Sequence, residues 1–245
     1  HNIHTLYRDR FGILWIGFEE SGLGRFDPNK SEFKLYKKNT SQQRKTGQGG
    51  TLSHNSVRAI FEDPSGILWV GTDIGLNRLD RKNDRFLLYK NHPLKPESLS
   101  HNEIRSIYLD RSGILWVGTY GGGVNKLNTR QKKFLHYKNE VDNPNSLSSN
   151  IVWSFCEDRR EILWIGTHQG GLNRFDRRTG QFTVYKHVPG DATSLSSNSV
   201  RQIYEDRSGQ MWIGTNGGGL CEFDRATGKF RTFRHDPGNP GSLSH

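Results

Sequence analysis

A unit of about forty-eight residues repeats along the whole chain. Each copy contains a Trp that follows Leu or Met and precedes Ile or Val and then Gly; these residues are Trp15, Trp69, Trp116, Trp164 and Trp212. The spacings are 54, 47, 48 and 48 residues, which indicates five copies, at approximately 1–50, 51–97, 98–145, 146–193 and 194–245. Repeats of this length stack on one another, so we expect a single domain over residues 1–245.

Four short apolar runs in each copy favour β-strands. In the third copy they span 104–110, 115–119, 124–128 and 134–137, with Gly, Asn, Asp and Ser between them. None has room for a helix of about ten residues or more. An antiparallel four-stranded unit of this size is typical of a propeller blade, whose faces are covered by neighbouring blades. We therefore expect an all-β fold: a β-propeller of five four-stranded antiparallel blades, either a closed five-bladed ring or five blades of a larger ring.

Composition agrees with a turn-rich β protein. The chain has 28 Gly in 245 residues, where average usage of about 7% would give roughly 17, and 11% aromatic residues. Cys156 and Cys221 are its only cysteines, which excludes a disulfide scaffold and a multi-cysteine metal site, so we expect no metal and no cofactor. No run approaches the roughly 18 apolar residues of a membrane helix. Residues 1–4 lack a Met and a signal pattern, so we expect a segment cut from a longer protein, without membrane insertion of its own.

The charge is strongly basic, with 35 Lys and Arg against 25 Asp and Glu, a formal +10. Binding to nucleic acid needs clustered positive charge. Here acidic residues separate the basic ones along the whole chain. We therefore expect a solvated surface of mixed charge and no nucleic-acid partner.

The recurring Trp has two interpretations, packing between blades or a ring of ligand-stacking platforms. Five identical residues beside aliphatic ones favour the core. The turn between the first two runs of a copy carries Gly at the position where a positive φ is expected, except in the fourth copy, which has Glu161 there. We expect that turn to be strained or differently shaped.

These motifs resemble the two-component regulator propeller repeat. The resemblance is carried by Asp-x-x-Gly-x-Leu-Trp-Ile/Val-Gly-Thr, as at 110–119, and by Gly-Gly-Leu-Asn-Arg-Phe-Asp, as at 170–176, and it covers essentially the whole chain. It implies a ligand-sensing β-propeller from the extracytoplasmic, periplasmic part of a bacterial membrane sensor, commonly a hybrid histidine kinase and sometimes a diguanylate cyclase. It also implies a response to breakdown products of complex glycans.

Departures from the repeat pattern are local. Phe18 stands where the other copies have Thr, and Gly24 and Cys221 stand where three copies have Asn. Members of the family usually resemble rings of seven blades, whereas five repeats are present here.

The longest and most variable segments connect one copy to the next. They are expected at 37–51, 91–98, 139–146 and 187–194. In an antiparallel blade these connections lie on the same face as the turn between the second and third strands. Because variation belongs to the binding face, we expect the ligand there.

One position in the first strand also varies while its neighbours do not. Aligned on the Asp that closes the strand, it holds His4, Arg58, Arg105, Trp153 and Arg201. We expect these side chains to form a ring near the mouth of the central funnel, where Arg suits carboxylates and sulfates and Trp suits the face of a sugar. Alternatively they pack between blades or pair with the carboxylates at the far end of the strand, which are Glu62, Glu157 and Glu205.

The turn between the second and third strands adds a second variable position. It holds Glu19, Asp73, Tyr120, His168 and Asn216. Variable polar residues on a uniform frame favour a tailored binding surface, and ordinary loop drift is the alternative. We predict Asp73, Tyr120, His168 and Asn216 as ligand-binding residues.

Enzyme chemistry finds little support in the sequence. Glycoside hydrolysis needs two carboxylates about 5 to 10 Å apart, and Glu103 is the only one in the leading half of the first strands. No hydrolase or nucleotide motif occurs. We predict a non-catalytic sensor whose partners are a small ligand, such as a glycan fragment, and the rest of the parent protein, with dimerisation as one means of signalling. The alternatives are a multivalent lectin or protein-interaction propeller with one site per blade pair, and a scaffold without a small ligand.

Overall fold

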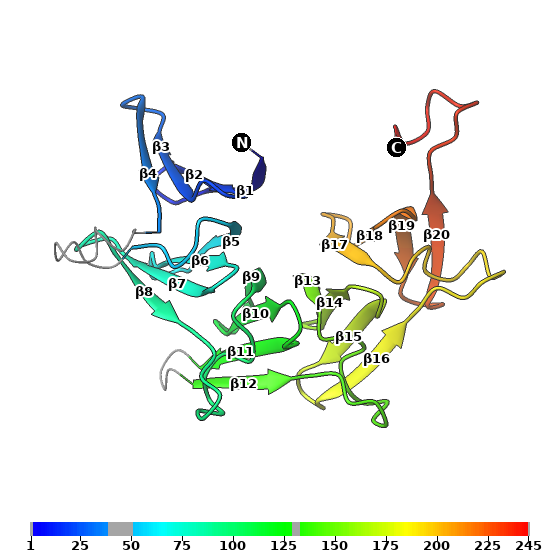
Figure 1. Ribbon diagram of the computed structural model, residues 1–245. Coiled ribbons are helices and arrows are strands. Elements are labelled where there is room, and N and C mark those ends of the chain that lie inside the picture. The colour runs from blue at the N-terminus through cyan, green and yellow to red at the C-terminus, as the bar shows by residue number, and fades with distance from the viewer. Residues whose placement is uncertain (1, 39–50, 129–132, 245) are drawn as a thin grey trace. The chain divides into compact units, whose positions relative to one another are not determined.

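The computed structural model describes residues 2–38, 51–128 and 133–244. All twenty of its elements are strands, and they form five four-stranded sheets, each with its strands in chain order (Figure 1). The all-β expectation of five antiparallel blades is confirmed. Among the described residues no helix is long and apolar enough to cross a membrane.

The sheets are numbered here as blades 1 to 5 in chain order. Blade 1 contains β1 (Ile3–Arg8), β2 (Leu14–Phe18), β3 (Leu23–Asp27) and β4 (Glu32–Tyr36); blade 2 contains β5 (Val57–Glu62), β6 (Leu68–Thr72), β7 (Gly75–Asp80) and β8 (Arg85–Tyr89). Blade 3 contains β9 (Ile104–Leu109), β10 (Leu115–Thr119), β11 (Val124–Asn128) and β12 (Lys133–Tyr137). Blade 4 contains β13 (Val152–Glu157), β14 (Leu163–Thr167), β15 (Leu172–Asp176) and β16 (Gln181–Tyr185). Blade 5 contains β17 (Val200–Glu205), β18 (Met211–Thr215), β19 (Gly219–Asp224) and β20 (Lys229–Phe233).

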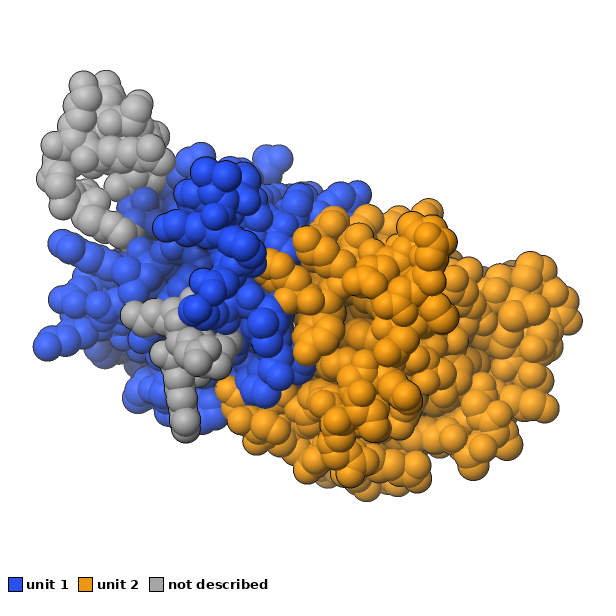
Figure 2. Space-filling model, turned by 90° about the horizontal axis from the view of Figure 1, so that it is seen from below, with its two compact units in different colours: residues 1–109, 114–120, 125–135 blue, residues 110–113, 121–124, 136–245 orange. Residues whose placement is uncertain are grey.

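The chain forms two compact units (Figure 2). Unit 1 comprises residues 1–109, 114–120 and 125–135, and so contains blades 1 and 2 and most of blade 3. Unit 2 comprises residues 110–113, 121–124 and 136–245, and contains blades 4 and 5. In unit 1 the first strand β5 contacts both β1 and β9, and in unit 2 β17 contacts β13. The first strands of successive blades therefore lie side by side within each unit.

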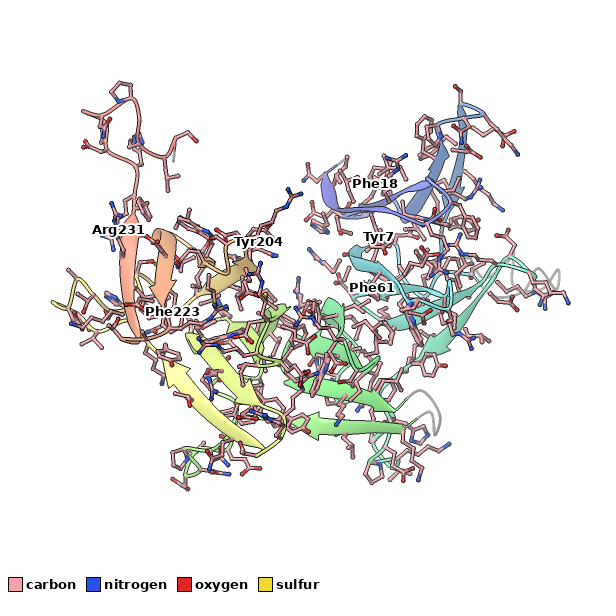
Figure 3. All side chains as sticks on the ribbon, turned by 180° about the vertical axis from the view of Figure 1, so that it is seen from behind. Tyr7, Phe18, Phe61, Tyr204, Phe223 and Arg231 are labelled. Atoms are coloured by element: carbon pink, nitrogen blue, oxygen red, sulfur yellow. The ribbon has the colours of Figure 1, made fainter. Side chains whose placement is uncertain are left out.

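Successive blades interlock through one aliphatic side chain and one glycine. Val57 of blade 2 packs against Gly17 of blade 1, where an added Cβ would lie 2.8 Å from Val57 Cγ1. Val200 of blade 5 packs in the same way against Gly166 of blade 4, again at 2.8 Å. Aromatic rings continue the contact, as between Tyr7 and Phe61, whose centroids are 6.1 Å apart (Figure 3). Within each unit, successive blades thus bury their faces against one another.

The recurring Trp belongs to this core. Trp15, Trp69, Trp116 and Trp164 are at most 3% exposed, so the platform interpretation fails for them. The Asp that closes the first strand accepts a hydrogen bond from the indole N–H, as Asp158 does from Trp164 at 2.9 Å. The same carboxylate accepts the backbone N–H of Ile162 at 3.1 Å, so it caps the turn and fixes the ring together.

Glu161 adopts the conformation that glycine has in the equivalent turns. Its φ is +64°, close to the +79° of Gly12 and the +87° of Gly209. The turn therefore has the same shape as in the other blades. Of the two expectations, a strained turn or a differently shaped turn, the structure shows the strained turn, because a positive φ is unfavourable for a residue other than glycine.

Blade 1 replaces a polar contact by an apolar one. In blade 2, Asn77 accepts the N–H of Ser53 at 3.0 Å and donates to the Ser53 hydroxyl at 2.9 Å. In blade 1, Gly24 occupies the position of that Asn, and a Cβ there would lie 3.2 Å from the ring of Phe18. The two departures of blade 1 from the repeat pattern, Phe18 in place of Thr and Gly24 in place of Asn, therefore compensate each other.

Candidate functional site

Every first strand contains a β-bulge at the same place. The pairing between the first two strands shifts register between residues 3 and 5, 57 and 59, 104 and 106, 152 and 154, and 200 and 202. The extra residue in each case is the variable one: His4, Arg58, Arg105, Trp153 and Arg201. A bulge bends the strand locally and redirects one side chain. It therefore removes these residues from the regular alternation that would otherwise place them on a sheet face.

The turn between the second and third strands carries the second variable residue fifteen positions later in every blade, and in blades 1 to 4 it contacts the bulge residue. In blade 2, Arg58 Nε donates to Asp73 Oδ1 at 3.0 Å. In blade 3 the guanidinium carbon of Arg105 lies 4.7 Å from the centroid of the Tyr120 ring. The two variable positions of the repeat thus meet within one blade.

In unit 1 these contacts join into one polar cluster. Arg58 Nη1 lies 2.9 Å from His4 Nε2, which links blade 2 to blade 1. His4 in turn lies 3.7 Å from Glu19 Oε1. Burial raises the pKa of Asp73, but hydrogen bonds led by that from Arg58 outweigh it and lower the pKa below its ordinary value. Asp73 is therefore an ionised partner of Arg58 at neutral pH.

Unit 2 carries an aromatic cluster at the same position. The rings of Trp153 and His168 have centroids 4.5 Å apart, and the guanidinium carbon of Arg201 lies 3.6 Å from the Trp153 centroid. His168 Nδ1 lies 3.3 Å from Ser199 Oγ. Asn216 is exposed, and its backbone N–H donates to the Ser199 carbonyl at 2.8 Å. The predicted residues thus gather in two groups of different chemistry, one in each unit.

A third position of the site was missed by sequence reasoning. The residue two places before the bulge also contributes: Asn2 donates to Glu19 at 2.7 Å, Glu103 pairs with Arg105, and Ser199 contacts His168. Its signal in the sequence is that it varies from copy to copy like the bulge residue, as Asn, Ser, Glu, Ile and Ser.

The far end of the first strand rules out the proposed pairing with the glutamates there. In the same blade, Arg225 Nη2 donates to Glu205 Oε1 at 2.7 Å, and Arg225 Nε lies 3.6 Å from Asp158 Oδ2 of the preceding blade. Arg81 and Arg177 bridge the corresponding carboxylates in the same way. We call this arrangement of one Arg, one Asp and one Glu the carboxylate clamp. Since the glutamates are bound there, the bulge residues do not pair with them. Arg58 and Arg201 instead contact a residue of the preceding blade, as the alternative of packing between blades expects.

The connections between blades also have a structural function. The N–H of Phe134 on the outer strand β12 donates to the Glu97 carbonyl at 2.9 Å, and the N–H of Phe230 on β20 donates to the Thr193 carbonyl at 2.8 Å. These two connections therefore cap the edge of the next blade's outer strand. In the first connection, predicted at 37–51, residues 39–50 lie outside the described residues.

No metal centre is formed by the part of the chain that the structure describes, because it contains no group of at least three His, Cys, Asp or Glu residues suited to one. The bulge end instead offers guanidinium, imidazole and carboxylate groups in unit 1, and guanidinium, imidazole, indole and hydroxyl groups in unit 2. Such a set recognises polar ligands by hydrogen bonding and stacking.

Comparison with known families identifies the repeats. The two-component regulator propeller family matches residues 51–73, 98–121, 146–169 and 194–217. Blades 2 to 5 thus carry repeats of this family. The matched segments run from the lead-in of each blade through the bulge to the second strand. The family assignment therefore covers the frame of the site in blades 2 to 5.

Solved structures extend the similarity to nearly the whole chain. The extracellular domain of a protein described as a hybrid two-component system from B. thetaiotaomicron is 30% identical, with a TM-score of 0.80, over 93% of this chain and 29% of that one. A second extracellular domain from B. thetaiotaomicron, of a one-component system, is 23% identical, with a TM-score of 0.59, over 94% of this chain and 37% of that one. The chain thus spans about a third of the length of these relatives or less.

An enzyme shares the fold at lower identity. Virginiamycin B lyase from Staphylococcus aureus is 14% identical, with a TM-score of 0.67, over 94% of this chain and 69% of the lyase. That likeness shows the fold alone. Among curated proteins, none matches the chain.

Proposed function

We propose that this propeller is the extracytoplasmic ligand-sensing part of a two-component signalling protein. The ligand binds at the bulge end of the first strands and changes the packing or dimerisation of the propeller. A kinase or cyclase elsewhere in the parent protein responds. The similarity to extracellular domains of B. thetaiotaomicron two-component systems supports both the role and a periplasmic location.

The observation that carries this proposal is the coincidence of bulge and variability. The strands and turns are alike from blade to blade, and each first strand contains a bulge. The residue that the bulge redirects, however, differs in type between blades. Structural positions in repeats keep one residue type, as the Trp does here. A redirected and variable position is therefore best explained by contact with a ligand.

The proposed ligand is an acidic oligosaccharide. Arginine forks bind carboxylates through paired hydrogen bonds, and the indole and imidazole rings offer apolar faces to a sugar. The side chain of Trp153 is half-buried, so part of its surface remains accessible. These groups together fit a ligand that is polar, charged and ring-shaped.

The domain is proposed to be non-catalytic. A general acid needs a raised pKa, whereas Asp73 has a lowered one because Arg58 binds it. A nucleophilic serine needs a base that a third group orients. His168, which lies near Ser199, packs instead on the Trp153 ring. The site is thus arranged for binding.

Isothermal titration with a panel of acidic oligosaccharides tests this proposal. We expect about one site per chain and no turnover of the ligand. Trp153→Ala should lower the affinity at least tenfold, while Arg178→Ala should leave it unchanged, because that side chain is 79% exposed outside the site. Absence of binding across the panel, or cleavage of a bound oligosaccharide, would contradict the proposal.

A second candidate, the multivalent lectin, is favoured by a repeated groove. A cavity of about 450 Å³ lies between blades 1 and 2, beside Phe11 and Arg81, and one of about 710 Å³ occupies the equivalent place between blades 4 and 5, beside Arg160 and Arg225. Both lie at the clamp end of the strands. Several equivalent sites per chain in the same titration, with no effect of Trp153→Ala, would support the lectin instead.

A further inference from the structure

The three arginines at the bulge positions differ in their charge environment. Arg58 is bound by Asp73 at 3.0 Å, and Arg105 forms an ion pair with Glu103. Each guanidinium is therefore neutralised by a carboxylate of its own blade.

Arg201 has no such partner among the residues that the structure describes. The two positions that supply a carboxylate elsewhere are neutral in blade 5: Asn216 stands where blade 2 has Asp73, and Ser199 stands where blade 3 has Glu103. No ion pair of Arg201 is found within the described ranges, and its side chain is exposed. The positive charge of Arg201 is thus not balanced by a carboxylate of the described residues.

The aromatic cluster places this guanidinium over an indole ring. Its central carbon lies 3.6 Å from the centroid of the Trp153 ring, a cation–π contact. Stacking occupies a face of the guanidinium and leaves the N–H groups around its edge to donate in the plane. A carboxylate binds in that plane through two parallel hydrogen bonds, and a stacked guanidinium loses little further freedom when it does so.

We propose that Arg201, in contact with Trp153, is the residue that binds the carboxylate of the ligand. This inference rests on the proposed sensing function, since it assigns one group of that ligand to one residue of unit 2. The specificity for an acidic ligand is then set by the absence of a carboxylate at two positions of blade 5.

The test uses matched ligands and matched variants. Each acidic oligosaccharide of the panel is titrated as the free acid and as its uncharged methyl ester. We expect the wild-type protein to bind the acid about 10- to 100-fold more tightly than the ester, as a charge-assisted hydrogen-bonded pair provides. Arg201→Gln should remove this preference, whereas Arg178→Gln should retain it.

The decisive variant adds a carboxylate beside Arg201. Asn216→Asp places an acid where Asp73 stands relative to Arg58, so it should neutralise Arg201 and reduce the preference for the acid over the ester to less than threefold. An unchanged urea midpoint shows that the fold is intact.

The outcomes separate this inference from the proposed function. If the wild-type protein binds none of the acids or esters, the sensing proposal fails and this inference fails with it. If it binds acid and ester equally, or if Asn216→Asp and Arg201→Gln keep the preference, the assignment to Arg201 is overturned while the sensing proposal stands.

Discussion

The two ends of each first strand differ in how far their residues repeat from blade to blade. At the clamp end, blades repeat the same chemistry: an Asp that caps a turn and binds an indole, and in three places an Arg that joins this Asp to the Glu of the following blade. At the bulge end no two neighbouring blades present the same set of side chains. The repeated end holds the blades together, and we expect stability to depend much less on the variable end.

Unit 1 contains a junction that shows what the clamp contributes. Between blades 2 and 3, Leu109 stands where the other junctions have Glu, and Pro64 stands where blade 1 has Arg10, whose N–H binds Glu62 at 2.9 Å. A proline has no N–H to donate, so the donor and the acceptor are absent together. An apolar junction is therefore a working alternative to the clamp, provided that both sides change.

Breaking one clamp should give the largest loss of stability. Arg225→Met removes the cation between Asp158 and Glu205, whose side chains are 1% and 8% exposed. Leaving buried carboxylates without their cation costs about 3–5 kcal/mol, so we expect the free energy of unfolding to fall by that amount. Urea unfolding followed by tryptophan fluorescence measures it.

The junction between blades 2 and 3 supplies the control. Arg225→Met combined with Glu205→Leu places an apolar side chain where blade 3 has Leu109 and should regain part of the loss. The recovery is incomplete because Arg159 keeps the N–H that binds Glu205 and that Pro64 lacks. Equal instability of the single and double variants would show that the clamp does not act through the charge of the glutamate.

Filling the contact between blades should have a smaller effect. A Cβ at Gly166 would lie 2.3 Å from Ser154 Oγ and 3.0 Å from the Val200 carbonyl oxygen, so Gly166→Ala should cost about 1–3 kcal/mol. The matched control is Gly214→Ala, because a Cβ at that glycine has its nearest neighbour at 3.7 Å. Equal losses in the two variants, measured in urea, would contradict this account of the blade contact.

Much of the frame could be predicted from the sequence, and the reason is repetition. A Trp, a closing Asp and a Gly recur at fixed distances, so period and strand order follow without knowledge of any single contact. The bulge could not be predicted in this way. The residue at the bulge is His, Arg or Trp in different copies, and it is never glycine. The bulge is specified by the register of the flanking pairs. The state of each arginine likewise depends on contacts that only the folded chain shows.

At the strained turn of blade 4, a substitution is expected to raise the free energy of unfolding. Glu161 has a φ of +64°, a conformation that costs a non-glycine residue about 1 kcal/mol or more. Glycine relieves the strain but loses more entropy on folding, so Glu161→Gly should stabilise the protein by about 0.5–1 kcal/mol. The reverse change in blade 5, Gly209→Glu, should destabilise it by a similar amount, and an unchanged urea midpoint in both would show that the turn relaxes.

The smallest effect is expected for Arg201, which lies at the bulge end of blade 5, whereas Arg225 lies at the clamp end of the same blade. Arg201→Gln removes a charge and one cation–π contact at an exposed site, worth about 0.5 kcal/mol. Arg225→Met and Arg201→Gln thus change the same residue type in one blade, and the expected losses differ by a factor of about six or more. Urea unfolding of both variants side by side checks this ratio. A loss of 2 kcal/mol or more (about half of the clamp's contribution) for Arg201→Gln would mean that the bulge end also stabilises the fold, and the variability of its residues would then need a structural explanation.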